Sequence, residues 1–384
     1  MPGLVSSTFL LIVAATLAVF TAVGAVVPVL PRYVEGPLGG GAVAIGFVVG
    51  AFFMATLLAR PLAGRLGDER GRKVVIVGGA AVMASAIAAF PLASNIAVLA
   101  LLRFIQGAGE AAFYVGAATA VTDLVPASRR GQAVSYFSGA LYAGIAVGPL
   151  VGEWVLGEGS YGRVWALAAA LGALAAVLAL GLREAPRPSA GTGARVRLIH
   201  PAALMPGSAF GLGTFGYAAF AAFMPLYAPS LGLKGSAPVF GLYAGITLVG
   251  RLFGARIPDR LGPSTTARAG LVVMAVGMAI LGVWHTVPGL WTGTVVFALG
   301  NAFMFPAVLS LALDAAPDGE RASVVGTVVA FFDLGQGAGA LLLGPLVAVS
   351  GYTGPFVAGA LAAIAGLGLL SAHLRRADLE LAPS

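Results

Sequence analysis

The side chains in this sequence that are best suited to chemistry interrupt long apolar stretches. Arg103, Gln106 and Glu110 all lie within one such stretch, residues 96–124. Their spacing of three and seven residues places them on one face of a helix, with Arg103 and Glu110 about two turns, or ~10 Å, apart. That separation is too long for a direct ion pair, but Gln106 lies between the two and can bridge them. We therefore expect a polar stripe in an otherwise apolar helix.

A second group lies in the apolar stretch 322–349, where Asp333 and Gln336 are one helical turn apart. Ionisable groups inside a membrane span are costly and usually functional. A carboxylate in such a place takes up or releases a proton as water reaches it or is excluded. We therefore predict that Glu110 and Asp333 couple to protons and that Arg103 modulates them, with substrate binding as a second candidate role for Asp333. The alternative is that these are structural polar groups that fix helix packing.

Other polar and aromatic side chains in the apolar stretches are candidates for the lining of a substrate cavity. For the tyrosines, packing in the core or against lipid is an equally good explanation. The predicted cavity residues are Gln106, Tyr114, Tyr142, Tyr217, Asn301 and Gln336.

The composition indicates an integral membrane protein. Of the 384 residues, 59% are hydrophobic and only 10% are charged, and the mean hydropathy is +0.96. Soluble domains are nearer half apolar and a quarter charged. The chain has no cysteine, and no His/Cys cluster or phosphate-binding loop occurs, so we expect no metal, no cofactor and no enzymatic activity. The net charge of +7 is better explained by basic membrane loops than by nucleic-acid binding.

Twelve stretches are long enough to cross a bilayer. The first is expected to be a retained helix because no basic segment precedes it. The Pro/Gly-rich segment 183–200 is expected to be a linker between an N-terminal bundle, 1–182, and a C-terminal bundle, 201–384. The predicted spans lie near 7–30, 42–63, 74–93, 96–124, 133–156, 163–182, 203–228, 238–257, 267–285, 290–316, 322–349 and 353–373.

The distribution of basic residues predicts the orientation in the membrane. An even number of spans puts both termini on one side. Eighteen of the 22 Lys and Arg residues fall on that side, three fall on the other, and Arg103 lies within a span. Because basic loops are retained in the cytoplasm, both termini are expected to be cytoplasmic.

The sequence repeats itself at an offset of 191 residues. Asp68 aligns with Asp259, Asp123 with Asp314, and Gly148 with Gly339. Many matches at one offset indicate duplication. Because each half crosses the membrane six times, the two halves insert in the same orientation.

Charge is concentrated in the ten residues GRLGDERGRK, 64–73. Gly64 and Gly71 are predicted to allow a tight reversal between two helices. Asp68 is expected near the start of the following helix, where the helix dipole favours a carboxylate. The basic residues of this segment can reach acids on neighbouring loops, and Asp123 is the expected partner. The alternative is a simple topology signal.

Small residues recur every four positions at Gly144, Gly148 and Gly152, next to Pro149. Such a stripe either packs closely against another helix or helps to seal one side of the membrane. Glu153 follows the stripe at the outer end of its helix, where we expect a solvated or helix-capping role.

These motifs together resemble the major facilitator superfamily, and the resemblance covers nearly the whole chain. The segment 64–73 is similar to the G-x-L-a-D-R-x-G-R-K loop of that family, and RFIQGAGEAA is similar to its R-x-x-q-G-x-g-a pattern. GIAVGPLVGE resembles the G-x-x-x-G-P-x-x-G-G antiporter signature, with Glu153 in place of the last glycine. The combination is typical of the twelve-helix drug:proton antiporter branch.

The resemblance implies an all-α membrane protein of twelve helices in two pseudo-symmetric six-helix bundles. It also implies a cytoplasmic gate that holds the bundles together when the cavity faces outward. The predicted gate residues are Gly64, Asp68, Gly71, Arg72, Lys73, Asp123 and Asp259.

The expected function is proton-coupled export of small, partly apolar molecules by a monomer in the cytoplasmic membrane. The partners are then a small-molecule substrate, protons and the lipid bilayer. The first helix carries only Thr16 and Thr21, without the acid that several antiporters have there, which shifts the coupling role to Glu110 and Asp333. Two alternatives remain open. One is a facilitator or exchanger of a hydrophilic metabolite such as a sugar, and the other is a membrane sensor that transports nothing.

Overall fold

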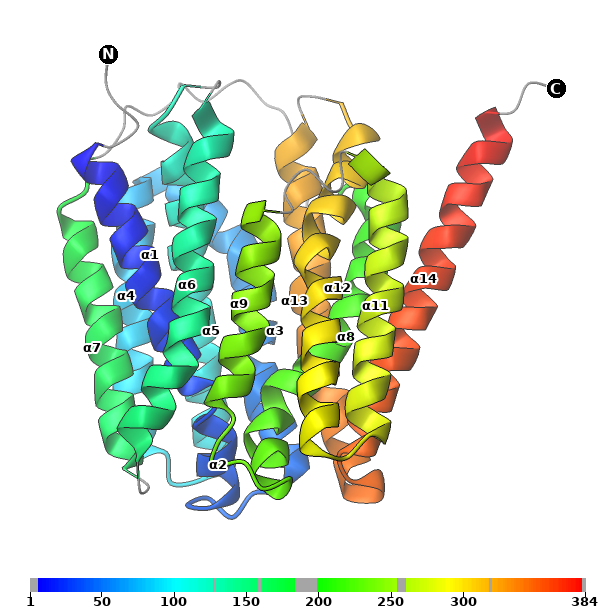
Figure 1. Ribbon diagram of the computed structural model, residues 1–384. Helices are drawn as coiled ribbons and strands as arrows, with labels where there is room; N and C mark the ends of the chain where they lie inside the picture. Colours follow the sequence, from blue (N-terminus) through cyan, green and yellow to red (C-terminus); the bar gives the residue numbers. More distant parts are fainter. Residues whose placement is uncertain are drawn as a thin grey trace. The chain divides into compact units, whose positions relative to one another are not determined.

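The computed structural model describes residues 6–126, 129–157, 160–183, 199–253, 260–317 and 320–381. Its regular elements are helices, labelled in Figure 1. The longer ones are α1 (Ser7–Val26), α2 (Leu30–Glu35), α3 (Ala42–Arg70), α4 (Arg72–Ala88), α5 (Ile96–Asp123), α6 (Arg130–Leu156), α7 (Tyr161–Leu180), α8 (Pro201–Ser230), α9 (Ala237–Phe253), α11 (Pro263–Val283), α12 (Val287–Asp314), α13 (Arg321–Ser350) and α14 (Thr353–Leu381).

Eleven helical segments of the described chain are long and apolar enough to cross a membrane. α9 has 17 residues and lies where a further span, 238–257, is predicted. The prediction of an all-helical membrane protein is therefore confirmed. The predicted linker, 183–200, falls almost entirely outside the described residues.

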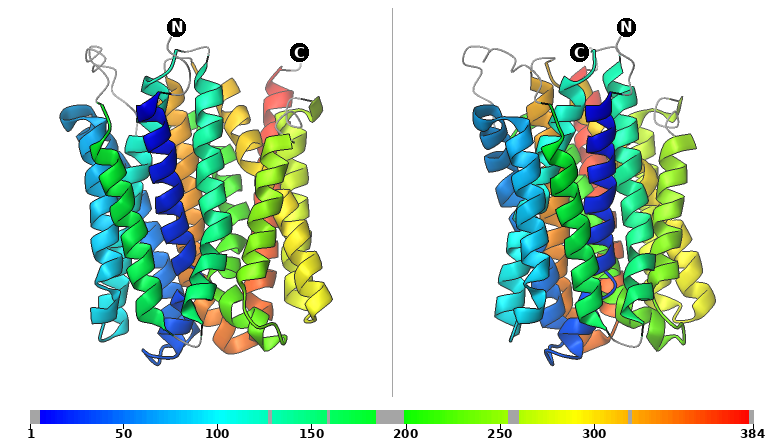
Figure 2. Two further views of the ribbon diagram at one scale, coloured as in Figure 1. Left: turned by 60° about the vertical axis from the view of Figure 1, so that its left-hand side comes forward. Right: turned by 90° about the vertical axis from the view of Figure 1, so that its left-hand side faces the viewer.

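The helices fall into two compact units. The first comprises residues 1–44 and 51–194, and the second comprises 45–50 and 195–384. In the first unit α1 packs against α6 and α7, and α4 packs against α5 and α7 (Figures 1 and 2). In the second unit α8 packs against α13 and α14, and α11 packs against α12 and α14. These four pairs correspond one to one, so the two units share this helix packing.

Helix boundaries repeat at the offset seen in the sequence. α5 begins at Ile96 and α12 at Val287, and both are capped by a side chain, Asn95 in the first unit and Thr286 in the second. Each cap accepts a hydrogen bond from a backbone N–H of the first turn, which that turn cannot satisfy internally. The two units therefore share local folding signals as well as hydrophobic pattern.

Glycine pairs set the spacing of the central helices in both units. A Cβ atom on Gly109 of α5 would lie 2.7 Å from the carbonyl oxygen of Gly79 on α4. A Cβ atom on Gly300 of α12 would lie 2.8 Å from the carbonyl oxygen of Gly270 on α11. Only glycine allows these backbones to approach so closely, as is common between membrane helices. This packing positions the polar face of α5.

Candidate functional site

The polar stripe of α5 is buried. Arg103 is 5% exposed and Gln106 is fully buried, and Arg103 Nη1 donates a 2.5 Å hydrogen bond to Gln106 Oε1. The guanidinium carbon lies 4.6 Å from the ring centroid of Phe52 on α3, a cation–π distance. The expected contact between Arg103 and Gln106 is therefore confirmed.

The expected bridge from Gln106 to Glu110 does not form. Glu110 is 4% exposed and lies one turn beyond Gln106 on the same helix. The Gln106 Nε2 atom is buried and has no hydrogen-bond partner among the described residues. The Gln106 side chain instead accepts a hydrogen bond from Arg103, and its amide nitrogen makes none to the carboxylate.

Tyr114 continues the stripe towards the end of α5. The guanidinium of Arg60 on α3 lies 4.9 Å from its ring centroid. Tyr114 also contacts Phe20 and Phe137 edge-on or at a tilt, with centroids 6.3 and 5.8 Å apart. The tyrosine therefore belongs to an aromatic and cationic cluster in the first unit, and its half-buried position is compatible with the predicted cavity role.

The cation–π contact of Arg60 has a counterpart in the second unit. Arg251 lies 5.7 Å from the ring centroid of Phe305, and both residues are 191 positions beyond Arg60 and Tyr114. The repeat in the sequence aligned the two arginines, but nothing in the helical periodicity indicated their aromatic partners. The offset applied to Tyr114 was the signal that could have found them.

The second unit replaces the stripe with aromatic rings. The Tyr217 ring lies 5.3 Å from that of Tyr243 and 6.5 Å from that of Phe297. Asn301 Nδ2 donates a 2.7 Å hydrogen bond to the Tyr243 hydroxyl. Two of the predicted cavity residues, Tyr217 and Asn301, therefore belong to one cluster. Tyr243, which contacts both of them, was not predicted from the sequence.

The second predicted acid is also buried. Asp333 and Gln336 of α13 are each 1% exposed, and Gln336 Oε1 has no hydrogen-bond partner among the described residues. Tyr142 of α6, the residue equivalent to Asp333, is half-buried. Asp333 thus has the low-water surroundings that the coupling hypothesis requires, although its role stays a prediction.

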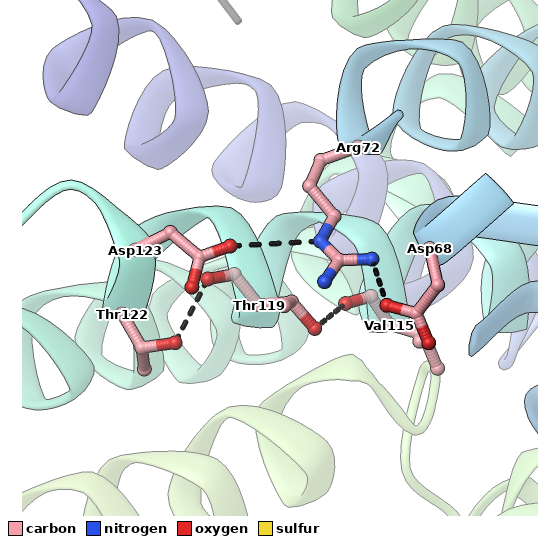
Figure 3. A network of polar contacts seen from close by, with 6 residues as sticks. All are labelled: Asp68, Arg72, Val115, Thr119, Thr122 and Asp123. Carbon is pink, nitrogen blue, oxygen red and sulfur yellow. Dashed lines mark hydrogen bonds and ion pairs between the residues drawn. The ribbon is translucent and has the colours of Figure 1, made fainter. Parts of the chain in front are cut away.

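Arg72 is the centre of a charged cluster at the end of the first unit where α1 begins (Figure 3). Its Nη1 atom lies 2.6 Å from Asp68 Oδ1, and its Nε atom lies 3.5 Å from Asp123 Oδ2. The expected partnership with Asp123 is therefore confirmed. The Arg72 and Asp123 side chains are 25% and 26% exposed, and that of Asp68 is 70% exposed, so water can reach every group of the cluster.

The backbone of the charged segment differs from the prediction. α3 continues to Arg70, so Gly64 is an ordinary helical residue and takes no part in a turn. Gly71 alone reverses the chain, with φ 102°, a value that favours glycine. Asp68 accordingly lies in the last turn of α3 rather than at the start of α4. The reversal needs only one residue because α4 begins directly at Arg72.

The remaining predicted gate residues contribute less to this geometry. Lys73 is half-buried on the first turn of α4. Asp259 lies outside the described residues. Gly67 was part of the motif, and a Cβ atom there would lie 3.1 Å from Arg72 Nη1, so its lack of a side chain leaves room for the guanidinium.

The glycine stripe of α6 packs directly on α1. Cβ atoms on Gly144 and Gly148 would lie 2.6–2.9 Å from backbone atoms of Leu17, Phe20, Thr21, Gly24 and Ala25, and Gly152 is equally tight against Ala25. Pro149 lies inside the same helix. The close-packing interpretation of the stripe is therefore confirmed, and a sealing role stays a prediction.

Glu153 is neither solvated nor a helix cap. Its side chain is 13% exposed, and Oε1 lies 2.9 Å from Arg32 Nη2, which α2 supplies. The Tyr161 hydroxyl donates a 3.4 Å hydrogen bond to the Arg32 carbonyl oxygen. The prediction failed because α2, which brings Arg32 to this position, was not foreseen as a separate helix.

The fold and the buried polar helices define a multi-span membrane transporter. The sequence profile of the Major Facilitator Superfamily matches residues 12–270 and 238–382. The chain belongs to this superfamily and is a membrane transporter of small molecules, not an enzyme. An uncharacterised MFS-type transporter of Pseudomonas aeruginosa (strain UCBPP-PA14) is 30% identical over 373 residues, covering 93% of this chain and 90% of that protein.

Solved structures of transporters have the same fold. The human organic anion transporter MFSD10 (TETRAN) superposes with a TM-score of 0.73 at 18% identity, covering 96% of this chain and 100% of that one. The nucleoside transporter NupG superposes with a TM-score of 0.75 at 15% identity, covering 95% and 98%. Because these two proteins are described as carrying different molecules, the shared fold does not identify the substrate of this chain.

Proposed function

We propose that this protein is a proton-coupled exporter of small amphipathic molecules that works by alternating access. The burial of Glu110 beside Arg103 and Gln106 on α5 carries the proposal. A carboxylate in an apolar span is costly when charged, and a cation two turns away offsets part of that cost. A small change in water access then changes whether the carboxylate is protonated.

Proton coupling in this scheme follows the exposure of Glu110. Protonation from outside favours the drier state, and exposure to the cytoplasm releases the proton. The resemblance of Gly144, Gly148 and Gly152 to the antiporter signature favours export over uptake. Asp333, buried in the second unit, is proposed to act on substrate affinity more than on coupling.

The cluster around Arg72 is proposed to be the cytoplasmic gate. Exposed ion pairs are each worth about 0–1 kcal/mol, so the pairs of Arg72 with Asp68 and Asp123 bias two states without trapping either one. We also propose that the protein acts as a monomer in the cytoplasmic membrane with both termini inside, an orientation that the excess of basic residues on that side supports.

The decisive experiment compares Glu110→Gln with the wild type in proteoliposomes. Glutamine mimics the protonated acid, so uphill transport driven by a pH gradient should be abolished. Substrate binding should remain and should no longer depend on pH. Asp333→Asn should have a milder effect, mainly on affinity.

Three results would contradict the proposal. Full uphill transport by Glu110→Gln would remove Glu110 from the coupling role. Wild-type flux that ignores the pH gradient would favour a facilitator or exchanger of a hydrophilic metabolite, and no flux of any compound would favour a sensor.

A further inference from the structure

Two buried hydrogen-bond donors on α5 have no acceptor. Arg103 Nε and Gln106 Nε2 are both inaccessible to water, and neither makes a hydrogen bond to any residue that the structure describes. Leaving a polar group unsatisfied in an apolar interior is costly. Two such groups one turn apart, on side chains already hydrogen-bonded to each other, indicate that an acceptor is missing.

The contacts of Arg103 leave one side of its guanidinium available. Nη1 is used by Gln106, and the flat face lies over Phe52 at 4.6 Å. The side without a hydrogen bond is the one that contains Nε, where Nε–H and the neighbouring N–H point in parallel. That side matches the two oxygens of a carboxylate.

The assignment of the Gln106 amide is unambiguous. Because a guanidinium only donates hydrogen bonds, the atom that faces Arg103 Nη1 must be the amide oxygen. The amide nitrogen therefore adds further donors to the same face. Within the described chain no carboxylate forms an ion pair with Arg103, and Glu110 is about 10 Å further along the helix.

Close helix packing fixes this donor set in place. A Cβ atom on Gly107 would collide with the carbonyl oxygen of Phe52, so glycine lets α5 approach α3 at the level where the Phe52 ring covers Arg103. The site has three components: a cation held flat on a ring, an amide held by that cation, and donors without acceptors.

We propose that Arg103 and Gln106 bind the carboxylate of the transported molecule, so that this protein carries amphipathic organic acids. The inference rests on the proposed function because it assigns the substrate class of that site. Arg103 Nε and its neighbouring N–H grip the carboxylate oxygens, and Gln106 Nε2 donates to one of them. Since both donors are enclosed in this state, the carboxylate enters in another state of the transport cycle.

The test uses the purified full-length protein in lipid nanodiscs at pH 7 and three matched probes. These are 2-naphthoate, 2-naphthamide and 2-naphthylmethylammonium, together with the same three head groups on a decyl chain. Binding is measured by calorimetry and by the rise in Tm. The carboxylates should bind about tenfold more tightly than the amides, the equivalent of one charge-assisted hydrogen bond, and the ammonium compounds should bind most weakly.

Three variants locate the effect. Gln106→Leu keeps the volume and should reduce the preference for carboxylate over amide several-fold, and Arg103→Gln should abolish it. Thr294→Val is the control, because Thr294 is the buried equivalent of Arg103 in the second unit and its hydroxyl bonds only to Leu290 of its own helix. It should keep the full preference. If Arg103→Gln does not fold, Gln106→Leu and the probe series still decide the question.

The proposal is overturned if amides bind as well as carboxylates, if ammonium probes bind best, if no carboxylate binds, or if both α5 variants keep the preference. Flux assays separate this inference from the proposed function. Carboxylate binding without pH-driven flux would refute proton-coupled export and leave the site intact. Proton-driven flux of neutral or cationic compounds alone would support proton-coupled export and refute the carboxylate site.

Discussion

The two units carry different side chains on equivalent helices, α5 in the first unit and α12 in the second. On α5, successive turns carry Arg103, Gln106 and Glu110, whereas the equivalent positions on α12 carry Thr294, Phe297 and Asn301. The first set forms a buried stripe of charges and donors. In the second, Phe297 and Asn301 join an aromatic cluster in which Asn301 bonds to Tyr243.

This difference shows what duplication preserved. The glycine contacts that hold α4 to α5, and α11 to α12, are the same in both units, because helix spacing depends on them. The polar and aromatic side chains on the other faces of α5 and α12 differ between the units. Packing therefore defines the shared scaffold, whereas the buried acids occupy non-equivalent helices, Glu110 on α5 of the first unit and Asp333 on α13 of the second.

The charged ends of the units differ in the same way. The first has Arg72 between Asp68 and Asp123, whereas the residue equivalent to Arg72 is Pro263, the first residue of α11. Proline fits that position because it needs no N–H donor there, but it cannot form an ion pair. Asp314 is exposed at the end of α12. Among the described residues, the charged cluster around Arg72 therefore has no counterpart centred on position 263.

The largest effect is expected where the units agree. Gly148→Leu on α6 should reduce flux by tenfold or more and lower the Tm, because a Cβ atom there already lies 2.6 Å from the Gly24 Cα atom and overpacking costs about 1–3 kcal/mol. Gly339→Leu, the equivalent change in the second unit, should act alike. Gly139→Leu, on the same helix as Gly148 and with no atom within 4 Å of its Cβ position, is the control. Unchanged flux and Tm for Gly148→Leu would disprove the packing argument.

The second largest effect is expected in the first unit and not at the equivalent position of the second. Arg72→Ala removes both ion pairs and should lower transport about tenfold, in the range of typical coupling energies between conformational states. Asp68→Asn should have a smaller effect in the same direction. Pro263→Ala should stay within about twofold of the wild type. Flux in proteoliposomes, at matched protein levels, measures all three. Wild-type flux in both first-unit variants would reduce the charged segment to a topology signal.

A smaller effect is expected at the other end of the first unit. Glu153→Gln should lower the free energy of unfolding by about 1 kcal/mol, because the Arg32 pair is largely shielded from water. The second unit has Gly344 at the equivalent position. A double-mutant cycle with Arg32→Gln, read by thermal unfolding, tests the pair. Strictly additive effects would mean that the two side chains do not stabilise each other.

The smallest effect is expected from a substitution that makes the second unit more like the first. Position 243 is equivalent to position 52 of the first unit, which is phenylalanine. Tyr243→Phe therefore matches the first unit and removes the hydrogen bond from Asn301. The loss should be about 1 kcal/mol or less of unfolding free energy, while the ring contacts with Tyr217 and Phe297 remain. A cycle with Asn301→Leu, again by thermal unfolding, checks the coupling. A loss of several kcal/mol would mean that the hydroxyl organises more than this one bond.

The sequence alone determined the class of fold, the repeat and one ion pair of the charged cluster around Arg72. Long apolar runs identify membrane helices because no other element satisfies its backbone in lipid. The offset of 191 residues foretold the matching ends of α5 and α12. The partnership of Arg72 with Asp123 was predictable because both lie at helix ends on the same side of the membrane.

Only the tertiary structure decided how the polar side chains pair. Gln106 is hydrogen-bonded to Arg103 and not to Glu110, although helical spacing allows either contact. Arg32 reached Glu153 from 121 residues away, through a helix that has no periodic signal of its own. α3 continues to Arg70 although Gly64, Gly67 and Asp68 are poor helix formers, and Gly71 suffices for the reversal. Periodicity specifies which face a residue occupies, whereas its partner depends on the helices that pack against that face.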